Sequence, residues 1–211
     1  MKIVRAKTPG IIKKIFSGYT WNIRTRKKTI YLTFDDGPIP GVTEWILDTL
    51  SKYNAKATFF CIGNNVTSNP EIYQRILKEG HAVGNHTYNH LKGWNTTKEK
   101  YLQNIKEAAI HIDSKLFRPP YGRITSSQAK ELRKMGYKII MWDVLAMDWD
   151  ANIPKEKCAD NVLKNSKEGS IVVFHDSLKA EHNMKYALTT TLDHFSKKGY
   201  SFESLDSWIV G

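Results

Sequence analysis

The sequence is poor in cysteine. Only Cys61 and Cys158 occur among its 211 residues, and no CxxC pair is present. The CxxC motifs that hold structural zinc or form a redox disulfide are therefore excluded. Because Cys61 follows the apolar run 58–60, we expect it to be a small residue of the core.

The sequence also lacks linkers, repeats and long apolar runs. A chain of this length with no tract rich in Pro, Gly or Ser is expected to fold as one domain with a full core. The apolar pair Ile11 and Ile12 is followed at once by two lysines, which leaves no signal-peptide core or membrane span near the N-terminus. We therefore expect an N-terminal extension over residues 1–27, a single domain over residues 28–211 and a cytoplasmic location. A short basic helix resting on a membrane surface, and export by a non-standard route, both remain open.

Acidic residues are outnumbered by basic ones, 21 to 32, and the net charge is +11. This excess favours anionic partners such as nucleic acid, an acidic glycan or a membrane surface. The lysines are scattered over segments with helical spacing and are not interleaved with aromatic residues along a stripe. We therefore expect no nucleic-acid binding. We expect the protein to be a monomer.

Helix-like and strand-like segments alternate about seven times. Apolar residues recur at helical spacing within 42–53, 70–78 and a longer stretch from Thr97, where Thr96 and Glu99 have the spacing of a capping box. Four segments end with a cation and then a glycine, as helices often do. These endings are 78–80, 134–136, 167–169 and 197–199, and the strand-like runs that follow them are 81–84, 137–144, 170–174 and 200–203. Such alternation predicts an α/β fold with a parallel sheet, either doubly wound or closed into a barrel.

Two carboxylates stand at the end of the first strand-like run. The run 29–32 leads into Thr33-Phe34-Asp35-Asp36-Gly37-Pro38, where glycine and proline stop the strand. Successive side chains of an extended backbone point in opposite directions, so one aspartate can face a metal ion while its neighbour faces a substrate. A simple hairpin turn would have the same residues.

Two histidines follow the third strand-like run, in His86-Thr87-Tyr88-Asn89-His90. On a helical turn, residues four apart share one side, so both imidazoles could reach one ion at about 2.0–2.1 Å. With one carboxylate from the first strand they make a His-His-Asp set that leaves room for water. The sequence therefore predicts a catalytic site for a divalent metal.

Three further clusters follow strand-like runs. In 118–122, two prolines stiffen the backbone beside Arg118, whose guanidinium can keep a carboxylate ionised, and beside the amide of Tyr121. Asp148 and Trp149 combine an orienting carboxylate with a ring face on which a sugar can rest. His175 is a candidate proton carrier. Because all these clusters lie at strand ends, we favour a distorted (β/α)7-8 barrel with its active site at the carboxyl ends of the strands.

With these residues in place, the chain resembles the NodB-homology polysaccharide deacetylases, family 4 of the carbohydrate esterases. The segment 33–38 resembles the first motif of that family, 86–90 the second and 118–121 the third. Asp148-Trp149 and Val173-Phe174-His175 resemble the fourth and fifth. The match runs in the family's order from Lys28 to Trp208. Two departures stand out: Leu145 replaces an earlier aspartate of the fourth motif, and Val173 replaces the usual leucine of the fifth.

The resemblance implies a metal-dependent hydrolase that removes acetyl groups from a glycan, such as N-acetylglucosamine units of peptidoglycan or a chitin-like oligomer. It implies that Asp35 is the general base and that Asp36, His86 and His90 bind zinc, or cobalt or manganese in its place. The roles implied for the remaining residues are an oxyanion contact from the Tyr121 N–H, proton donation by His175, orientation of His175 by Asp148, positioning of Asp35 by Arg118, and substrate contacts by Tyr121, Trp149 and Pro120.

Two alternatives belong to other functional classes. A carbohydrate-binding protein of the same fold would have little or no turnover, but the presence of Asp35, Arg118, Asp148 and His175 argues against it, because binding alone needs no acid and base. A basic nucleic-acid binder would show a steep salt dependence and release no acetate.

Overall fold

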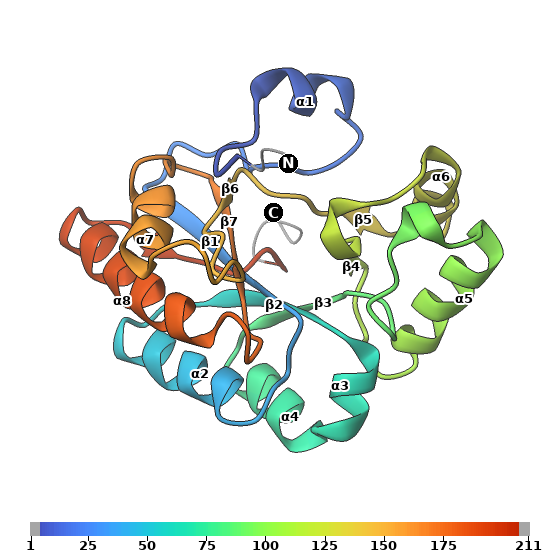
Figure 1. Cartoon of the computed structure of the whole chain (residues 1–211), viewed down its shortest axis with the longest axis horizontal. Coiled ribbons are helices and arrows are strands. Elements are labelled where there is room, and N and C mark those ends of the chain that lie inside the picture. The colour runs from blue at the N-terminus through green and yellow to red at the C-terminus, as the bar shows by residue number, and fades with distance from the viewer. Residues whose placement is uncertain (1–4, 207–211) are drawn as a thin grey trace.

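Strands and helices alternate through the chain as predicted (Figure 1). The computed structural model describes residues 5–206, so residues 1–4 of the predicted extension and 207–211 of the predicted domain lie outside the described residues. The strands are β1 (Thr29–Asp35), β2 (Ala57–Cys61), β3 (Ala82–Asn85), β4 (Leu116–Phe117), β5 (Lys138–Ile139), β6 (Val144–Leu145), β7 (Ile171–His175) and β8 (Ser201–Phe202). The helices are α1 (Gly10–Ile15), α2 (Val42–Lys52), α3 (Gly63–Ser68), α4 (Pro70–Lys78), α5 (Lys98–Ala109), α6 (Ser126–Lys134), α7 (Lys155–Leu163) and α8 (Glu181–Lys197), with single 3-10 turns η1 (Gly93–Asn95) and η2 (Pro120–Gly122).

The strands form one parallel sheet in the order β5-β4-β3-β2-β1-β7-β6, with β8 added beside the start of β1. Helices surround this sheet on the outside (Figure 1). The predicted distorted β/α barrel is confirmed, and it is an open one, because β5 and β6 are the two ends of the strand order. Parallel order brings the carboxyl ends of all these strands to one edge, where the site is expected.

The N-terminal segment lies in the opening between β5 and β6. Thr20 forms a parallel bridge to Ile140, and Lys7 forms an antiparallel bridge to Val144. The single strand-like run expected over 137–144 is therefore wrong: it breaks into β5 and β6, because the chain must cross the opening from one end of the sheet to the other. The backbone of residues 140–143, between the two strands, is therefore free to form hydrogen bonds with groups outside the sheet.

A buried carboxylate holds the N-terminal segment against this crossing. Asp143 is 1% exposed and accepts Lys7 Nζ at 2.6 Å, and it also pairs with Lys13. Burial alone would raise the pKa of Asp143, but hydrogen bonds from Lys13, Lys7 and the Ser170 hydroxyl, with the charge of Lys7, hold it below its usual value. Two of the basic residues thus share one buried carboxylate within the molecule. None of the helices between residues 5 and 206 is long and apolar enough to cross a membrane.

Strand β1 shows how the sheet separates core from site. Phe34 points toward the helices and stacks on Phe59 and Phe174 of the neighbouring strands, at centroid distances of 5.0 and 6.0 Å. The residues on either side of it, Thr33 and Asp35, point the other way and bind Arg118 inside the sheet's curve. Period-two alternation therefore places an aromatic core on one face and the functional groups on the other.

Helix ends agree with the sequence in most places. The predicted terminal glycines Gly80, Gly136 and Gly199 follow α4, α6 and α8 and have positive φ, between 74° and 84°. The helix end predicted at 167–169 is wrong, because α7 ends at Leu163 and Gly169, with φ of 76°, lies in a turn before β7. The expected capping box at the start of α5 is wrong, because the N-cap is Thr97, whose hydroxyl accepts the N–H of Lys100. Helix α3 was not expected, since its sequence GNNVTS has no helical apolar period.

Candidate active site

The two aspartates at the end of β1 turn in different directions. Asp35 is 4% exposed and follows the inward direction of Thr33. Asp36 leaves the strand with φ of 92°, a strained value for a residue with a Cβ. Two hydrogen bonds hold it there: its N–H donates to the Phe60 carbonyl at 3.3 Å, and its own carbonyl accepts Asn65 Nδ2 at 2.7 Å. The adjacent carboxylates therefore have different partners: Asp35 faces Arg118, and Asp36 faces the two histidines.

Gly37 is required at the next position because Asp176 lies against it. A Cβ built on Gly37 would stand 1.7 Å from Asp176 Oδ2. Asp176 is fully buried, and its carboxyl group accepts the Gly37 N–H and the Thr43 hydroxyl, each at 2.8 Å. Burial, together with the charge of Asp36, raises the pKa of Asp176 well above its usual value. This side chain therefore fixes the turn that aims Asp36.

The segment carrying the two histidines is an irregular loop, so the helical turn expected for it is wrong. Thr87 and His90 both have positive φ, 66° and 54°. Hydrogen bonds from outside the loop hold this backbone: Asn85 Oδ1 accepts the Thr87 N–H at 2.8 Å, and Asn104 Oδ1 accepts the N–H groups of residues 88 and 89 at 3.0 Å. The imidazoles face the same way because the loop folds back on itself.

The structure brings Asp36, His86 and His90 together. One ligand atom from each lies within 4.8 Å of the others. Asp36 Oδ1 is 3.2 Å from His90 Nε2 and 3.8 Å from His86 Nε2. A cation placed among three such atoms would bond to all of them after small side-chain movements.

The chemical state of these groups fits a divalent metal. His86 Nδ1 lies 2.8 Å from the Arg118 carbonyl, to which it must donate a proton, so Nε2 is the free ligand atom. Burial lowers the pKa of His86 to about 4, which keeps it neutral as metal binding requires. Burial alone would raise the pKa of Asp36, but the His90 hydrogen bond and the charges of His175, His86 and His90 bring it below its usual range. Two imidazoles and one carboxylate leave positions open for water and substrate.

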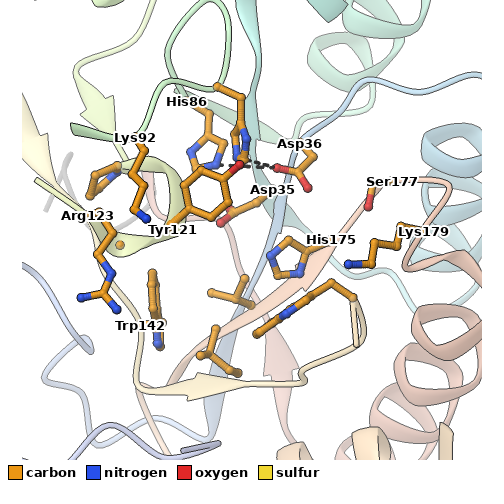
Figure 2. Close-up of a pocket in the computed structure, with 16 residues that line it drawn as sticks. Asp35, Asp36, His86, Lys92, Tyr121, Arg123, Trp142, His175, Ser177 and Lys179 are labelled. Atoms are coloured by element: carbon orange, nitrogen blue, oxygen red, sulfur yellow. Dashed lines mark ion pairs between the residues drawn. The ribbon is translucent and has the colours of Figure 1, made fainter. Parts of the chain in front are cut away.

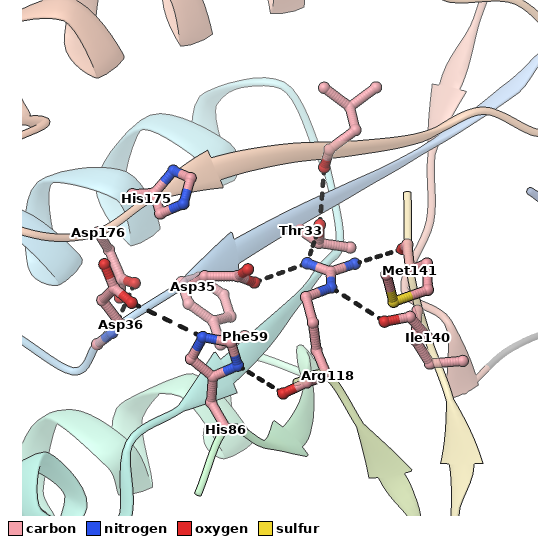
Figure 3. Close-up of polar contacts among 12 residues, drawn as sticks. Thr33, Asp35, Asp36, Phe59, His86, Arg118, Ile140, Met141, His175 and Asp176 are labelled. Atoms are coloured by element: carbon pink, nitrogen blue, oxygen red, sulfur yellow. Dashed lines mark hydrogen bonds and ion pairs between the residues drawn. The ribbon is translucent and has the colours of Figure 1, made fainter. Parts of the chain in front are cut away.

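Arg118 holds Asp35 in place from the interior (Figure 3). It is completely buried, and its Nη1 donates to Asp35 Oδ1 at 2.6 Å and to Thr33 Oγ1 at 2.8 Å. Its Nε and Nη2 donate to the carbonyls of Ile140 and Met141, at 3.3 and 3.0 Å. These two carbonyls are available because β5 ends at Ile139. The break in the predicted strand therefore supplies half of the arginine's partners.

His175, the last residue of β7, is oriented by Asp148. Its Nδ1 lies 2.9 Å from Asp148 Oδ1, and its backbone N–H donates to Oδ2 at 2.8 Å. Trp149 packs edge-on against the imidazole, with centroids 4.7 Å apart. Burial lowers the pKa of His175, but the charge and hydrogen bond of Asp148, with the charges of Asp36 and Asp35, raise it to about 9. At neutral pH the imidazole is thus protonated, with Nε2 directed away from Asp148.

These groups meet at a cavity of about 520 Å³ (Figure 2). Asp35, Asp36, His86, His90 and His175 line it, and aromatic residues surround them. The full set adds Lys92, Pro119, Tyr121, Gly122, Arg123, Trp142, Leu145, Trp149, Val173, Ser177 and Lys179. Leu145 and Val173, the two departures from the family motifs, both face the cavity with apolar side chains.

One predicted substrate contact, Pro120, lies outside the cavity lining. Pro119 lines the cavity, whereas Pro120 is buried and is not among the lining residues. Proline at the start of the 3-10 turn η2 is directed into the protein, while the exposed tip of the turn is Tyr121, with φ of 59°. Tyr121 is 62% exposed, and its ring lies 4.7 Å from that of His90.

Several residues that support the site were missed. Asp176, Asn65 and Asn104 hold the backbones that carry the metal-ligand candidates. Only Asp176 had a local signal, its place directly after His175. The asparagines lie in helices α3 and α5, far from any motif, so nothing in their sequence surroundings distinguishes them from surface residues. Trp142, Ser177 and Lys179 were likewise recognised only when the fold brought them to the cavity.

A parallel β/α barrel with a His-His-Asp cluster, a paired carboxylate and a protonated histidine around one cavity defines a candidate metal-dependent hydrolase. The polysaccharide deacetylase family model matches residues 22–140. The chain therefore belongs to the polysaccharide deacetylase family, as its motifs indicated, and this family is generally metal-dependent.

Several of the similar proteins are named as peptidoglycan deacetylases. A peptidoglycan-N-acetylglucosamine deacetylase of Bacillus cereus is 39% identical over 201 residues, 92% of this chain and 94% of that protein. The peptidoglycan-N-acetylmuramic acid deacetylase PdaA of Bacillus subtilis is 33% identical over 93% of this chain and 76% of its own length. The crystal structure of the Bc1960 peptidoglycan N-acetylglucosamine deacetylase superposes with a TM-score of 0.87 at 32% identity, covering 95% of this chain and 96% of that one.

Proposed function

We propose that this protein is a hydrolase that removes the N-acetyl group from N-acetylglucosamine units of peptidoglycan. The observation that carries the proposal is the convergence on one cavity of three groups: the Asp36, His86 and His90 cluster, the Asp35–Arg118 pair and the His175–Asp148 pair. Relatives similar over almost the whole chain carry the name of this activity.

The cluster of Asp36, His86 and His90 would bind a divalent ion. Zinc is the ion that best matches two imidazoles and a carboxylate. Bound there, the ion supplies Lewis-acid polarisation of the acetyl carbonyl. Cobalt or manganese accept the same donors, and we expect either to replace zinc in part. His86 is the most firmly placed ligand, because the Arg118 carbonyl fixes its ring and its tautomer.

Asp35 acts as the general base in this proposal. Its Oδ1 accepts a hydrogen bond from Arg118, while its side chain lines the cavity and can accept the proton of an attacking water. The fixed guanidinium also prevents Asp35 from turning toward the metal cluster. Asp35 and Asp36 thus keep separate roles although they are neighbours in sequence.

His175 acts as the general acid. Its imidazole is protonated at neutral pH and faces the cavity, so it can donate a proton to the amine nitrogen as the C–N bond breaks. Asp148 holds the ring by its Nδ1 side and stabilises the charged form. The Tyr121 N–H is the proposed donor to the acyl oxygen, and the rings of Tyr121 and Trp149 are proposed sugar contacts.

A sugar-binding protein without turnover is the competing explanation. Such a protein would gain nothing from a buried arginine paired with a buried carboxylate, which is costly to desolvate. The test is acetate release from peptidoglycan fragments, chitooligosaccharides and acetylated xylan, after chelation and after restoring zinc, cobalt or manganese. We expect metal-dependent release from the N-acetylated glycans. Binding of these glycans without acetate release under any metal would contradict the proposal.

We also propose that the N-terminal segment contacts an anionic membrane surface. Ile11 and Ile15 of α1 are each 63% exposed, and Phe16 directly after the helix is 43% exposed. An apolar face next to basic residues suits a bilayer with anionic lipids. Co-sedimentation with phosphatidylglycerol vesicles, but not with phosphatidylcholine vesicles, is expected for the wild type and should be lost in Ile11→Ser/Ile15→Ser. Equal sedimentation of both proteins would refute this contact.

A further inference from the structure

One edge of the catalytic cavity carries basic side chains that the proposed chemistry does not use. Lys92 and Arg123 line the cavity on one side, and Figure 2 shows them across the cavity from Ser177 and Lys179. Neither Lys92 nor Arg123 forms an ion pair with a carboxylate among residues 5–206, whereas Asp35 is already paired with Arg118. The edge therefore offers positive charge that no carboxylate of the described residues neutralises.

The aromatic residues at this edge are exposed yet held rigidly. Trp94 is 53% exposed, although its Nε1–H donates to the Ile124 carbonyl at 3.0 Å and the Arg123 guanidinium lies 4.2 Å from its ring centre. A large ring that is anchored but left in water is typical of a ligand-contacting surface. Packing alone gives no reason to hold a tryptophan in this way.

The two loops that carry these side chains are locked together. The Gly93 N–H donates to the Arg123 carbonyl at 3.0 Å, and a Cβ on Gly93 would stand 2.5 Å from that oxygen. Gln128 spans the joint, donating to the Gly93 carbonyl at 2.9 Å and accepting the Thr125 N–H at 2.9 Å. The edge is therefore preorganised, which lowers the entropic cost of binding a ligand there.

The position of these side chains relative to the metal-ligand candidates indicates the chemistry of the ligand. The Tyr121 ring lies 4.7 Å from the His90 ring on one side and 5.9 Å from Lys92 Nζ on the other. The Tyr121 ring thus lies between Lys92 and the metal-ligand candidate His90. A glycan whose acetamido group enters the reaction centre would place the substituents of its neighbouring sugar at this edge.

We propose that Lys92 and Arg123, with Trp94 behind them, form a carboxylate-binding subsite that makes the enzyme prefer glycans with an acid next to the acetylated sugar over neutral glycans. This inference rests on the proposed deacetylase function and adds its substrate class. The carboxylate has two chemical sources in peptidoglycan, the lactyl ether of muramic acid and the peptides attached to it. A guanidinium and an ammonium recognise both in the same way.

The test uses one tetrasaccharide of alternating N-acetylglucosamine and N-acetylmuramic acid in three forms: with free lactyl carboxylates, with these capped as carboxamides, and with peptides attached. Chitotetraose is the neutral reference. We expect wild-type kcat/KM to be higher for a form bearing carboxylates than for the carboxamide form. The form that shows the larger preference identifies the source of the acid.

The variants are Lys92→Gln, Arg123→Gln and their combination. We expect each single change to lower kcat/KM on the carboxylate substrate roughly 5-fold and the double change 10-fold or more, mainly through KM, while the rate on chitotetraose stays within about 2-fold. Lys92→Arg should retain the preference. Lys106→Gln, an exposed lysine of α5 that does not line the cavity, is the matched control for loss of one charge.

Three results would overturn the subsite: equal losses on the carboxylate and carboxamide forms, no loss on either, or the same loss in Lys106→Gln, which would indicate a diffuse field. Titration calorimetry with the carboxylate and carboxamide forms separates this inference from the proposed function. If no acetate is released from any substrate, the function fails, and binding selective for the carboxylate form that is lost in the double variant still supports the subsite. Equal affinity for the two forms refutes it.

Discussion

The floor and the rim of the cavity are built on opposite principles. The floor residues Asp35, His86, Arg118 and Asp148 are between 0 and 4% exposed and are fixed by hydrogen bonds, several of them to backbone groups. The rim residues Lys92, Trp94, Tyr121 and Arg123 also stand on hydrogen-bonded backbone, but their side chains are held mainly by ring contacts, and Tyr121 is 62% exposed. This difference supports our proposals that the floor carries out the reaction and that the rim selects the glycan.

The largest loss is expected when a floor residue that binds the metal is removed. His86→Ala and His90→Ala should each lose metal, and turnover should fall to the level of the chelated protein, because two ligands cannot hold the ion in place. Zinc content by elemental analysis and acetate release measure the two effects. His182→Ala changes an exposed histidine of α8 and serves as the control. Full zinc content in both variants would remove His86 and His90 from the ligand set.

The next loss is expected at the base. Asp35→Asn keeps the shape of the side chain but cannot accept a proton, so turnover should fall by roughly 10²–10⁴-fold. Metal content should remain at the wild-type level, because Asp36 and not Asp35 lies with the histidines. The pair of measurements therefore separates a base from a ligand. Near wild-type turnover would show that another group takes the proton.

A smaller effect is expected when the base is retained but its support is weakened. Arg118→Lys keeps the charge and loses the fork that reaches the carbonyls of Ile140 and Met141. We expect turnover to fall roughly 10- to 100-fold, together with a lower melting temperature, since buried carbonyls lose their donors. The kcat should fall while KM for chitotetraose changes little. A change confined to KM would place Arg118 in substrate binding.

The sequence predicted the floor well for a physical reason. Catalytic groups at strand ends appear as short motifs, because a strand delivers its last residues to one edge of the sheet. Thus 33–38 and 173–175 were located correctly within the barrel. The reason offered for His86 and His90 was wrong, however: positive φ at Thr87 and His90, supported by Asn104 from α5, brings the rings together. A contact between residues 15 or 16 positions apart leaves no local pattern.

The amino-acid composition also could not predict which charged residues pair with each other across the fold. The net charge predicted anionic partners, yet Lys7 and Lys13 are bound to buried Asp143 where the N-terminal segment closes the sheet. The same crossing supplies the carbonyls that bind Arg118. The apolar run 137–144 by itself predicts one strand. The chain breaks it into two because it must cross from one end of the sheet to the other, and this requirement depends on the whole topology.

The proton donor offers a test through pH. His175 has its pKa raised to about 9, so its acid form is present at neutral pH and is lost as pH rises through that value. The rate should therefore fall as the pH rises, with a midpoint at or below pH 9. A metal cation beside Asp36 would offset part of the charge by which Asp36 raises the pKa of His175, and this would move the midpoint below 9. In Asp148→Asn the main raising charge is gone, and the alkaline limb should move at least roughly one pH unit lower. A limb in the same place in both proteins would exclude His175 as the acid.

The smallest effect is expected at the rim. Tyr121→Ala removes an exposed ring, so we expect KM to rise roughly 3- to 10-fold with kcat nearly unchanged and a melting temperature close to that of the wild type. Tyr121→Phe retains the ring and its contact with His90, and it should behave like the wild type. Both variants keep the backbone amide, so the proposed oxyanion donor is untouched. A fall in kcat as large as that of Arg118→Lys would mean that the ring belongs functionally to the floor, because loss of substrate binding alone raises KM and leaves turnover at saturating substrate unchanged.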